Sequence, residues 1–321
     1  MITGQGAPGD WPDELGKVGL TVTGPLGAGM DGVVYALDDG TVAKVWIRQD
    51  ATSLTRLANF YAQLDATGLP FATPLMHEIR SVAGTPVTIE RRLAGRPLSA
   101  YLASLDRPDH PEQRERLERA MRTFVDVLAA LREVTVPPPA TRAMAVMDEP
   151  EPFYAPDEAW PGALERLVHR RFDAYGPVLR AAVVDLDALL DRVVGGLRAL
   201  PGVGSAVVHG DLCTPNLLID DDLRVVSVLD WGYLSTAGDP AFDASLAAGF
   251  FDMYGGKARS IDQTLTDWIV AEFGYPPEVL ALYRMVYAIA GACAYDPAGG
   301  DGHFAWCVDQ LRRPDLRALL S

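Results

Sequence analysis

Cysteines and histidines are scarce in this sequence. The 321 residues include three cysteines, Cys213, Cys293 and Cys307, which are too few and too scattered for a disulfide framework, and none forms a C-x-x-C pair typical of zinc sites. The five histidines show no metal-ligand spacing either. Reduced thiols fit a reducing compartment, so we expect a cytoplasmic location.

Long apolar runs are also missing. The longest, near residues 285–295, is shorter than the roughly 20 residues that a membrane-spanning helix needs. The Gly- and Asp-rich start of the sequence does not have the pattern of a signal peptide. We therefore expect no membrane association.

Basic residues are outnumbered by acidic ones. The chain has 28 Lys and Arg against 43 Asp and Glu, a formal net charge of −15. Neutralising a nucleic-acid backbone takes a basic patch and none is evident, so we expect no nucleic-acid partner. The acidic surface could simply maintain solubility, and it could also concentrate a cationic small molecule.

The first 93 residues have the pattern of a small β-rich lobe. Short β-rich runs at 20–23, 33–37, 41–46 and 87–92 are separated by turn signals such as Asp38-Asp39-Gly40. Residues 53–66 carry apolar side chains at helical spacing. We therefore predict a small sheet with one helix over residues 1–93.

The remainder, residues 96–321, is predicted to be a larger and mainly helical lobe. Helices are expected at 111–134 and 183–200, with an irregular Pro- and Glu-rich excursion to Pro161 between them. Strands are expected at 206–208, 217–219 and 225–229, and the pattern is helical again from Phe242 onward. The fold class is α+β.

A glycine-rich loop lies between the first two predicted strands. Residues 27–32 match G-x-G-x-x-G, a spacing shared by dinucleotide-binding and kinase-type loops. A dinucleotide fold requires a helix directly after the glycines, whereas residues 33–37 continue as a strand. In the kinase-type alternative, Gly27, Gly29 and Gly32 let backbone amides approach the oxygens of a triphosphate.

Lys44 follows on the next strand, in Val42-Ala43-Lys44. A charged side chain among apolar neighbours is costly unless an anion pairs with it, and the α- and β-phosphates of a nucleotide can be that anion. Taken alone, Lys44 could be an edge-strand lysine that reaches solvent. The glycine loop before it favours the phosphate-binding role.

Residues 207–218 carry the strongest functional signal. Asp211 and Asn216 have the D-x-x-x-x-N spacing of a kinase catalytic loop and lie between two apolar strands. Asp211 can accept the proton of a substrate hydroxyl, and the amide oxygen of Asn216 suits Mg²⁺. Asp230, in the metal-binding strand predicted at 225–231, supplies a second metal ligand.

Three motifs together resemble the aminoglycoside phosphotransferase family of protein-kinase-like small-molecule kinases. They are His-Gly-Asp-x4-Asn at 209–216, Leu-Asp-Trp at 229–231 and Gly-Asp-Pro-x2-Asp at 238–243. The resemblance runs from about Gly24 to the last helices. It implies a bilobal protein-kinase-like fold, ATP or GTP as donor, Mg²⁺, and phosphorylation of a small-molecule hydroxyl by a monomer or homodimer.

The resemblance also implies residue roles. It places a hinge at residues 90–95, where backbone groups of Arg91 and Leu93 would bond the adenine. Asp239 and Asp243 would brace the catalytic loop. The acceptor would lie between this loop and the C-terminal helices, whose carboxylates and aromatic rings suit an aminoglycoside, an amino sugar or a related cationic alcohol.

One feature departs from the family pattern. The helix after the lysine strand normally carries a glutamate that pairs with the lysine, but residues 51–68 contain none. Lys44 is then held by phosphates alone, by Asn59 or by a carboxylate from elsewhere. We predict an ATP- or GTP-dependent, magnesium-requiring O-phosphotransferase, and the alternative is a pseudokinase or a small-molecule binding module without transferase activity.

Overall fold

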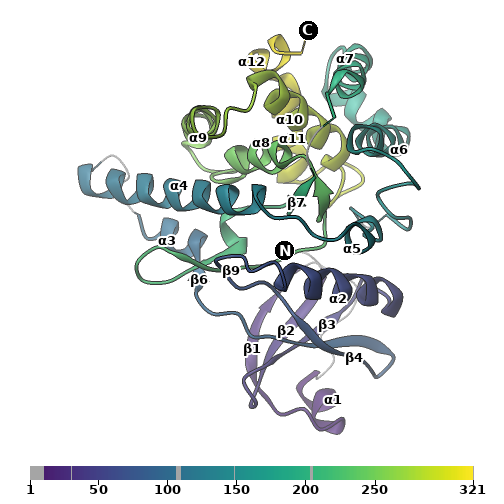
Figure 1. Cartoon of the computed structure of the whole chain (residues 1–321), viewed down its shortest axis with the longest axis vertical. Coiled ribbons are helices and arrows are strands. Elements are labelled where there is room, and N and C mark those ends of the chain that lie inside the picture. The colour runs from purple at the N-terminus through teal and green to yellow at the C-terminus, as the bar shows by residue number, and fades with distance from the viewer. Residues whose placement is uncertain (1–10, 30, 106–109, 148, 203–204, 321) are drawn as a thin grey trace. The chain divides into compact units, whose positions relative to one another are not determined.

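The structure is a computed structural model that describes residues 11–29, 31–105, 110–147, 149–202 and 205–320. These residues form two compact units (Figure 1). The first unit holds the described residues up to Gly68 together with Ala72–Ala94, and the second holds Leu69–Phe71 and the chain from Gly95 onward. The first ten residues of the predicted N-terminal lobe and Met30 of the glycine loop lie outside the described residues.

The N-terminal unit contains a five-stranded sheet in which all neighbouring strands are antiparallel. In sheet order the strands are β1 (Val22–Ala28), β2 (Gly32–Leu37), β3 (Val42–Trp46), β5 (Thr85–Glu90) and β4 (Met76–Val82). The turn at Asp38-Asp39-Gly40 joins β2 to β3, and Asp39 accepts a hydrogen bond from the N–H of Thr41 at 2.9 Å.

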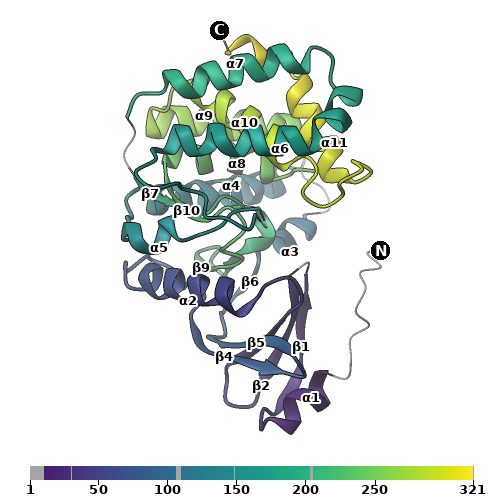
Figure 2. The same ribbon diagram turned by 90° about the vertical axis from the view of Figure 1, so that its right-hand side faces the viewer.

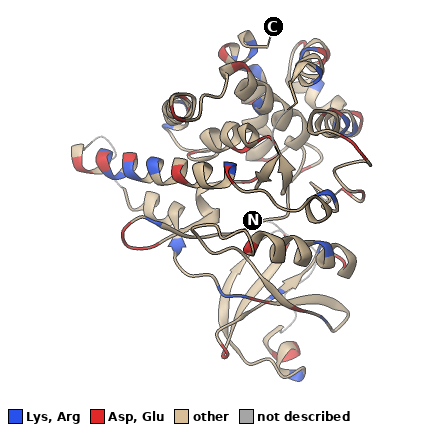
Figure 3. Ribbon diagram, in the orientation of Figure 1, with Lys and Arg blue, Asp and Glu red and all other residues tan. Residues whose placement is uncertain are grey.

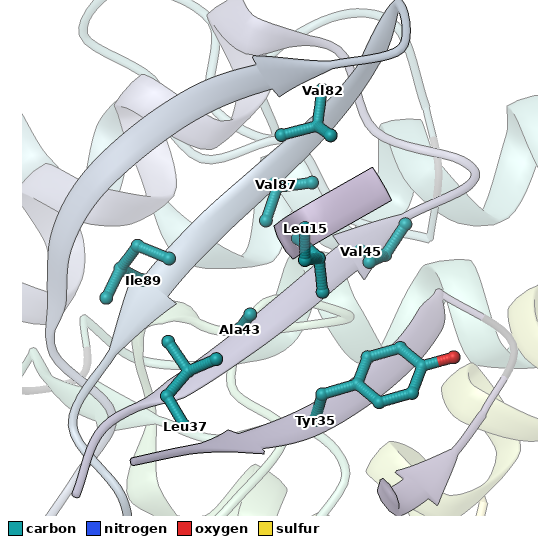
Figure 4. Close-up of a cluster of buried hydrophobic side chains, with 8 residues drawn as sticks. All are labelled: Leu15, Tyr35, Leu37, Ala43, Val45, Val82, Val87 and Ile89. Atoms are coloured by element: carbon teal, nitrogen blue, oxygen red, sulfur yellow. The ribbon is translucent and has the colours of Figure 1, made fainter. Parts of the chain in front are cut away.

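One face of this sheet is covered by apolar side chains, as strand alternation requires. Leu15 of helix α1 (Trp11–Lys17) lies over this face and is fully buried (Figure 4). The other members of the cluster come from the strands: Tyr35, Leu37, Ala43, Val45, Val82, Val87 and Ile89. The second helix, α2 (Ala51–Asp65), packs against β4, and its N-cap Asp50 accepts from the N–H of Ser53 at 2.7 Å.

The sequence analysis missed two elements of this unit. Helix α1 has seven residues and buries only Leu15, so it offers no helical period to detect. Strand β4 lies at the sheet edge, and its charged residues Glu78 and Arg80 pair with each other at 2.6 Å. The expectation of a single helix was therefore wrong, whereas the small antiparallel sheet was confirmed.

The C-terminal unit is mainly helical, as expected. Its helices are α3 (Leu98–Ala103), α4 (Pro111–Arg132), α5 (Pro138–Arg142), α6 (Trp160–Ala182), α7 (Leu186–Ala199), α8 (Pro240–Phe250), α9 (Ala258–Phe273), α10 (Pro277–Gly291), α11 (Gly302–Arg312) and α12 (Pro314–Ala318). A three-stranded sheet has the order β6 (Arg96–Pro97), β8 (Leu217–Ile219) and β9 (Val225–Val228), and β7 (Ala206–Val208) pairs with β10 (Thr236–Gly238).

Helix α6 was not expected from the sequence. It contains Pro177, and a proline inside a helix removes a backbone hydrogen bond and obscures the helical pattern. The helix expected from residue 183 begins instead at Leu186, because Val183 is extended and Asp185 adopts a left-handed conformation with φ of 58°. Figure 2 shows α6 and α7 side by side, and α10 packs against both of them and against α8.

Charge is distributed unevenly over these helices. Acidic and basic residues are interspersed along α4, whereas α8 is almost free of charge (Figure 3). Every residue of α8 from Ala241 to Phe250 is buried. None of the helices in the described part of the chain combines the length and the apolar character needed to cross a bilayer.

A buried ion cluster ties together the helices behind α8. Asp262 of α9 accepts from Arg284 of α10 at 3.1 Å and from Arg313, which precedes α12. Arg284 also donates through Nε to the carbonyl of Ser245 in α8, at 3.0 Å. Burial by itself would raise the pKa of Asp262, but the two arginines hold this pKa below its usual value. The cluster therefore fixes α8 relative to α9 and α10.

Replacing Asp262 with asparagine should destabilise the protein strongly, because it leaves the buried guanidinium of Arg284 without its counter-ion and leaves Arg313 with Asp315 alone. We expect a loss of about 3–5 kcal/mol of unfolding free energy in urea titrations at neutral pH. Because the pKa of Asp262 is lowered in the folded state, this stabilisation exists above the ordinary Asp value of 3.8 and is lost as the pH falls below it. Glu14→Gln, at an exposed pair with Lys17, should change little.

Candidate active site

The loop between β7 and β8 brings Asp211 and Asn216 together. A single 3₁₀ turn at Thr214–Asn216 ends this loop and folds Asn216 back toward Asp211. The Asn216 side-chain amide donates to the backbone carbonyl of Asp211 at 3.0 Å and to its Oδ2 at 3.4 Å. Asn216 is buried and Asp211 is half-buried.

His209 is a structural part of this loop. It is completely buried, and its Nδ1 accepts from the N–H of Asp211 at 3.2 Å. Its Nε2 lies 2.8 Å from the carbonyl of Leu229, so the neutral tautomer with the proton on Nε2 satisfies both contacts. Burial lowers the pKa of His209 to about 4, which keeps the ring neutral at physiological pH.

Asp243 of α8 fixes the backbone of this loop. Its two carboxylate oxygens accept from the N–H groups of His209 and Gly210, each at 2.7 Å. Gly210 has a φ of 79°, and a Cβ at this position would lie 2.1 Å from the Cβ of Leu234, so only glycine fits. Burial raises the pKa of Asp243 to about 6, and the two donated hydrogen bonds oppose that rise.

Asp239 has a different structural task from Asp243. Its Oδ1 caps α8 by accepting from the N–H of Ala241 at 2.9 Å, and its Oδ2 accepts from the hydroxyl of Tyr283 at 2.7 Å. The brace expected from both aspartates is therefore made directly by Asp243, while Asp239 fixes the start of the helix that carries Asp243.

Asp230 follows β9 in a left-handed conformation, with a φ of 55°. Such a conformation is uncommon outside glycine, and it persists only where the surroundings enforce it. On one side, the N–H of Leu229 donates to the carbonyl of Asn216 at 2.8 Å. On the other, Trp231 is buried and its ring nitrogen donates to the carbonyl of Val228 at 3.1 Å. Asp230 is thereby held next to the Asp211 loop.

The pKa of Asp211 is raised to about 7. Burial is the largest cause, the negative charge of Asp230 adds to it, and the hydrogen bond from Asn216 opposes it. Neighbouring negative charges repel each other, and a cation bound beside them would relieve that repulsion. The described residues contain no cluster of three or more His, Cys, Asp or Glu side chains that could hold a metal by themselves, so a cation here would rely on Asn216 and Asp230 and on oxygens from a ligand.

In the N-terminal unit, the predicted phosphate loop is the hairpin between β1 and β2. Gly29 donates its N–H to the carbonyl of Gly32 at 2.9 Å, which closes the turn. A Cβ at Gly27 or Gly29 would meet no atom within 4 Å, whereas one at Gly32 would lie 1.7 Å from the carbonyl oxygen of Val45. Gly32 is thus required by packing against β3, and Gly27 and Gly29 leave room for an incoming group.

Lys44 lies at the middle of β3. Within the described part of the N-terminal unit, neither a carboxylate nor Asn59 bonds its ammonium group. The Nζ atom instead lies 3.7 Å from the centroid of the Trp46 ring. Asp65, the acidic residue at the end of α2, pairs with Arg91 at 2.7 Å.

The predicted hinge follows β5. The N–H of Arg91 donates to the carbonyl of Leu75 at 2.9 Å, so the carbonyl is the backbone group of Arg91 that could still meet an adenine. Leu93 lies in the irregular segment that follows. The hinge residues therefore stay candidates for base recognition, with the guanidinium of Arg91 already engaged by Asp65.

Two tyrosines of the helical unit lie within electrostatic range of Asp211. The pKa values of Tyr254 and Tyr295 are both raised, first by partial desolvation of these rings and then by nearby negative charges that include Asp211. Tyr295 stacks on Tyr233 with ring centroids 6.3 Å apart. Tyr233 was missed by the sequence analysis, although it lies only two residues after Trp231 in the Leu-Asp-Trp motif.

Other carboxylates and aromatic rings of the C-terminal helices, where the acceptor was expected, contact neighbouring side chains. Glu272 pairs with Arg122 at 2.6 Å, and Trp268 stacks on the same guanidinium. Phe250 and Trp306 are buried against Tyr287 in the core. These side chains stabilise the helical unit.

Solved structures of several phosphotransferases are similar to this chain. Macrolide 2'-phosphotransferase MphH from Brachybacterium faecium is 20% identical, with a TM-score of 0.54 over 95% of this chain and 98% of that one. Aminoglycoside phosphotransferase APH(3'')-Id from Streptomyces rimosus is 18% identical, with a TM-score of 0.54 over 90% and 96%. APH(2'')-IIa, solved with gentamicin, is 13% identical, with a TM-score of 0.63 over 99% of both chains. A search of curated protein sequences gave no significant match.

The β-rich and helical units have the protein-kinase-like fold of these phosphotransferases. The model of the phosphotransferase enzyme family matches residues 23–277. The chain belongs to this family. The resemblance seen in the sequence motifs is thereby confirmed.

Asp211→Asn should stabilise the protein at neutral pH. Because the folded-state pKa of Asp211, about 7, exceeds its ordinary value of 3.8, the stability cost of ionising this side chain grows as the pH rises from 3.8 to about 7 and is complete above that. In metal-free buffer with a chelator, the variant should melt higher than wild type at about pH 8, and the difference should shrink toward about pH 5. Asp222→Asn, in the exposed β8–β9 turn, should show no such pH dependence. Equal melting of Asp211→Asn and wild type at both pH values would contradict the electrostatic assignment.

Proposed function

We propose that the chain transfers the γ-phosphoryl group of ATP or GTP to a hydroxyl of a cationic small molecule, such as an aminoglycoside, an amino sugar or a related amino alcohol. The observation that carries this proposal is the geometry around Asp211. Its carboxylate is fixed by Asn216, lies close to Asp230, and has a pKa near neutrality. A group of that pKa is well suited to accept a proton at physiological pH.

The nucleotide would be held by the N-terminal unit. Backbone groups at Gly27 and Gly29 have the open space that close approach to phosphates requires, Gly32 fixes the hairpin, and Lys44 supplies a positive charge. The carbonyl of Arg91 and the backbone of Leu93 would meet the base. Related structures support nucleotide use, since APH(3'')-Id was solved with ADP and streptomycin and aminoglycoside 2'-phosphotransferase-IIIa with GDP.

Asn216 and Asp230 would hold Mg²⁺. The donor set, one amide oxygen and one carboxylate, is typical of magnesium sites that rely on substrate phosphates and water for their remaining ligands. When bound, the ion would neutralise charge on the phosphate oxygens.

In the reaction, Asp211 would orient the acceptor hydroxyl and take its proton. The acceptor oxygen forms a bond to the γ-phosphorus, and the bond from that phosphorus to the β–γ bridging oxygen breaks, so a nucleoside diphosphate leaves. The amide of Asn216 keeps Asp211 in position through both of its hydrogen bonds. Catalysis by these residues is mainly positioning and charge stabilisation.

The acceptor would be recognised by tyrosines and a carboxylate near Asp211. Tyr254 is 68% exposed and Tyr295 37% exposed, so part of each ring is open to a ligand. Asp301, which also raises the pKa of Tyr254, caps α11 with its Oδ1, while its buried Oδ2 has no hydrogen-bond partner in the described part of the chain. Ring faces and an unsatisfied carboxylate oxygen suit an ammonium-bearing sugar.

The direct test is magnesium-dependent transfer of the γ-phosphate from ATP and from GTP to a panel of aminoglycosides, amino sugars, amino alcohols, macrolides and neutral sugars. Wild type should phosphorylate one cationic class. Asp211→Asn should lower kcat by roughly 10²–10⁴-fold, because proton acceptance is lost while the nucleotide contacts remain.

Two results would count against this proposal. Nucleotide binding without transfer to any acceptor would favour a pseudokinase or binding module. Preference for neutral or anionic alcohols would overturn the cationic acceptor while leaving the kinase activity in place.

Asp230→Asn should raise the magnesium concentration needed for half-maximal activity by roughly 10-fold or more, because a carboxylate ligand is replaced by a weaker amide oxygen. The measurement is a magnesium titration at saturating nucleotide. Asp222→Asn is the matched control, since it removes an aspartate just before the same strand at an exposed position. An unchanged magnesium requirement in Asp230→Asn would show that this side chain is not a metal ligand.

A further inference from the structure

We propose that Trp46 is a positioning residue for Lys44 and replaces the helix glutamate that this chain lacks. In this arrangement the Trp46 ring holds the ammonium group by a cation–π contact, and a buried hydrogen-bond chain through Thr88 to Glu90 holds the ring. The inference rests on the proposed function in one respect, namely that Lys44 contacts the phosphates of a nucleotide.

The strand register places the four side chains on one face of the sheet. Lys44 and Trp46 are two residues apart in β3, and Thr88 and Glu90 are two residues apart in β5. Lys44 lies directly opposite Thr88 in the antiparallel β3–β5 pair. Because side chains alternate between the two faces of a strand, these four lie opposite the apolar cluster that contains Val45, Val87 and Ile89.

A directional chain of hydrogen bonds fixes the ring. The indole N–H of Trp46 donates to the hydroxyl of Thr88 at 2.8 Å, and that hydroxyl donates to the carboxylate of Glu90. Trp46, Thr88 and Glu90 are 2%, 0% and 7% exposed, so the chain is shielded from water. A threonine hydroxyl can accept one hydrogen bond and donate another, which makes Thr88 the connecting link.

The chemistry of this chain favours a cation on the ring. Lys44 Nζ lies 3.7 Å from the ring centroid, where the negative face of the indole attracts an ammonium group. Hydrogen bonds that end on a buried carboxylate polarise one another and draw the indole proton toward the acceptor, which leaves the ring more electron-rich. Lys44 is thus held in place without an ion pair, so its full charge stays available for phosphate oxygens.

The plain alternative is that Trp46 only fills space in the sheet. A core tryptophan would affect folding, and its loss would weaken nucleotide binding through general distortion. The two explanations differ in whether the effect of Trp46 depends on the charge of Lys44. A double-mutant cycle measures that dependence directly.

The experiment is isothermal titration of MgADP into wild type, Lys44→Met, Trp46→Leu and the double variant. Trp46→Leu should weaken binding by roughly 2- to 30-fold, the range of a cation–π contact between exposed and desolvated sites. In the Lys44→Met background the same change should have almost no further effect, and Trp46→Phe, which keeps a ring face, should restore part of the loss. Equal weakening in both backgrounds would overturn the proposal.

Thr88→Val provides a second route if Trp46→Leu does not fold. It removes the acceptor of the indole N–H and should raise KM for the nucleotide more than it lowers kcat. Thr85→Val is the matched control, because it removes the same hydroxyl from β5 on the opposite face. Equal effects of the two threonine variants would contradict the positioning role of the chain.

The cycle also separates this inference from the proposed transferase activity. If wild type binds MgADP and transfers no phosphoryl group, the proposed function fails, but the coupling between Lys44 and Trp46 can still be measured and decides the inference. If wild type binds no nucleotide at all, both are overturned.

Discussion

The candidate site depends on one interaction, in which the carboxylate of Asp243 accepts hydrogen bonds from two backbone N–H groups. These groups belong to His209 and Gly210, immediately before Asp211. Buried amide donors must be satisfied, and a carboxylate that accepts two of them fixes the direction in which the chain enters the loop. Asp243 is itself placed by α8, whose start is capped by Asp239 and whose far side is tied to Arg284. The position of Asp211 is therefore set by the interior of the helical unit.

The electrostatic character of the loop follows from that burial. His209 is kept neutral, so it adds no positive charge to offset Asp211 and Asp230. Two carboxylates next to each other are costly for the fold, and proteins keep such an arrangement where a cation supplies the compensating charge. Asp230 is kept beside Asp211 in a left-handed conformation by the contacts of its neighbours Leu229 and Trp231.

The parts of the structure that the sequence predicted correctly are those set by local pattern. The apolar runs at β7 and β8 and the five-residue separation of Asp211 and Asn216 are local features, and the loop between the two strands is short. The missed parts depend on tertiary contacts. Helix α6 is stabilised by packing despite Pro177, and Tyr233 stacks on Tyr295. The separate roles of Asp239 and Asp243 depend on the contact of Asp239 with Tyr283.

The partner of Lys44 also depends on a tertiary contact and could not be predicted from the sequence. Sequence alone revealed that the helix glutamate is missing, and the alternation of β3 would have placed Trp46 beside Lys44 on one face. The alignment of β3 with β5 brings Thr88 opposite Lys44, and no local pattern specifies that register. Glu90 belongs to the strand and not to the helix, and it connects to the Trp46 ring through the hydroxyl of Thr88. In the proposed arrangement a carboxylate on the strand holds the lysine through this ring, so the charge offered to phosphates would not depend on the placement of α2.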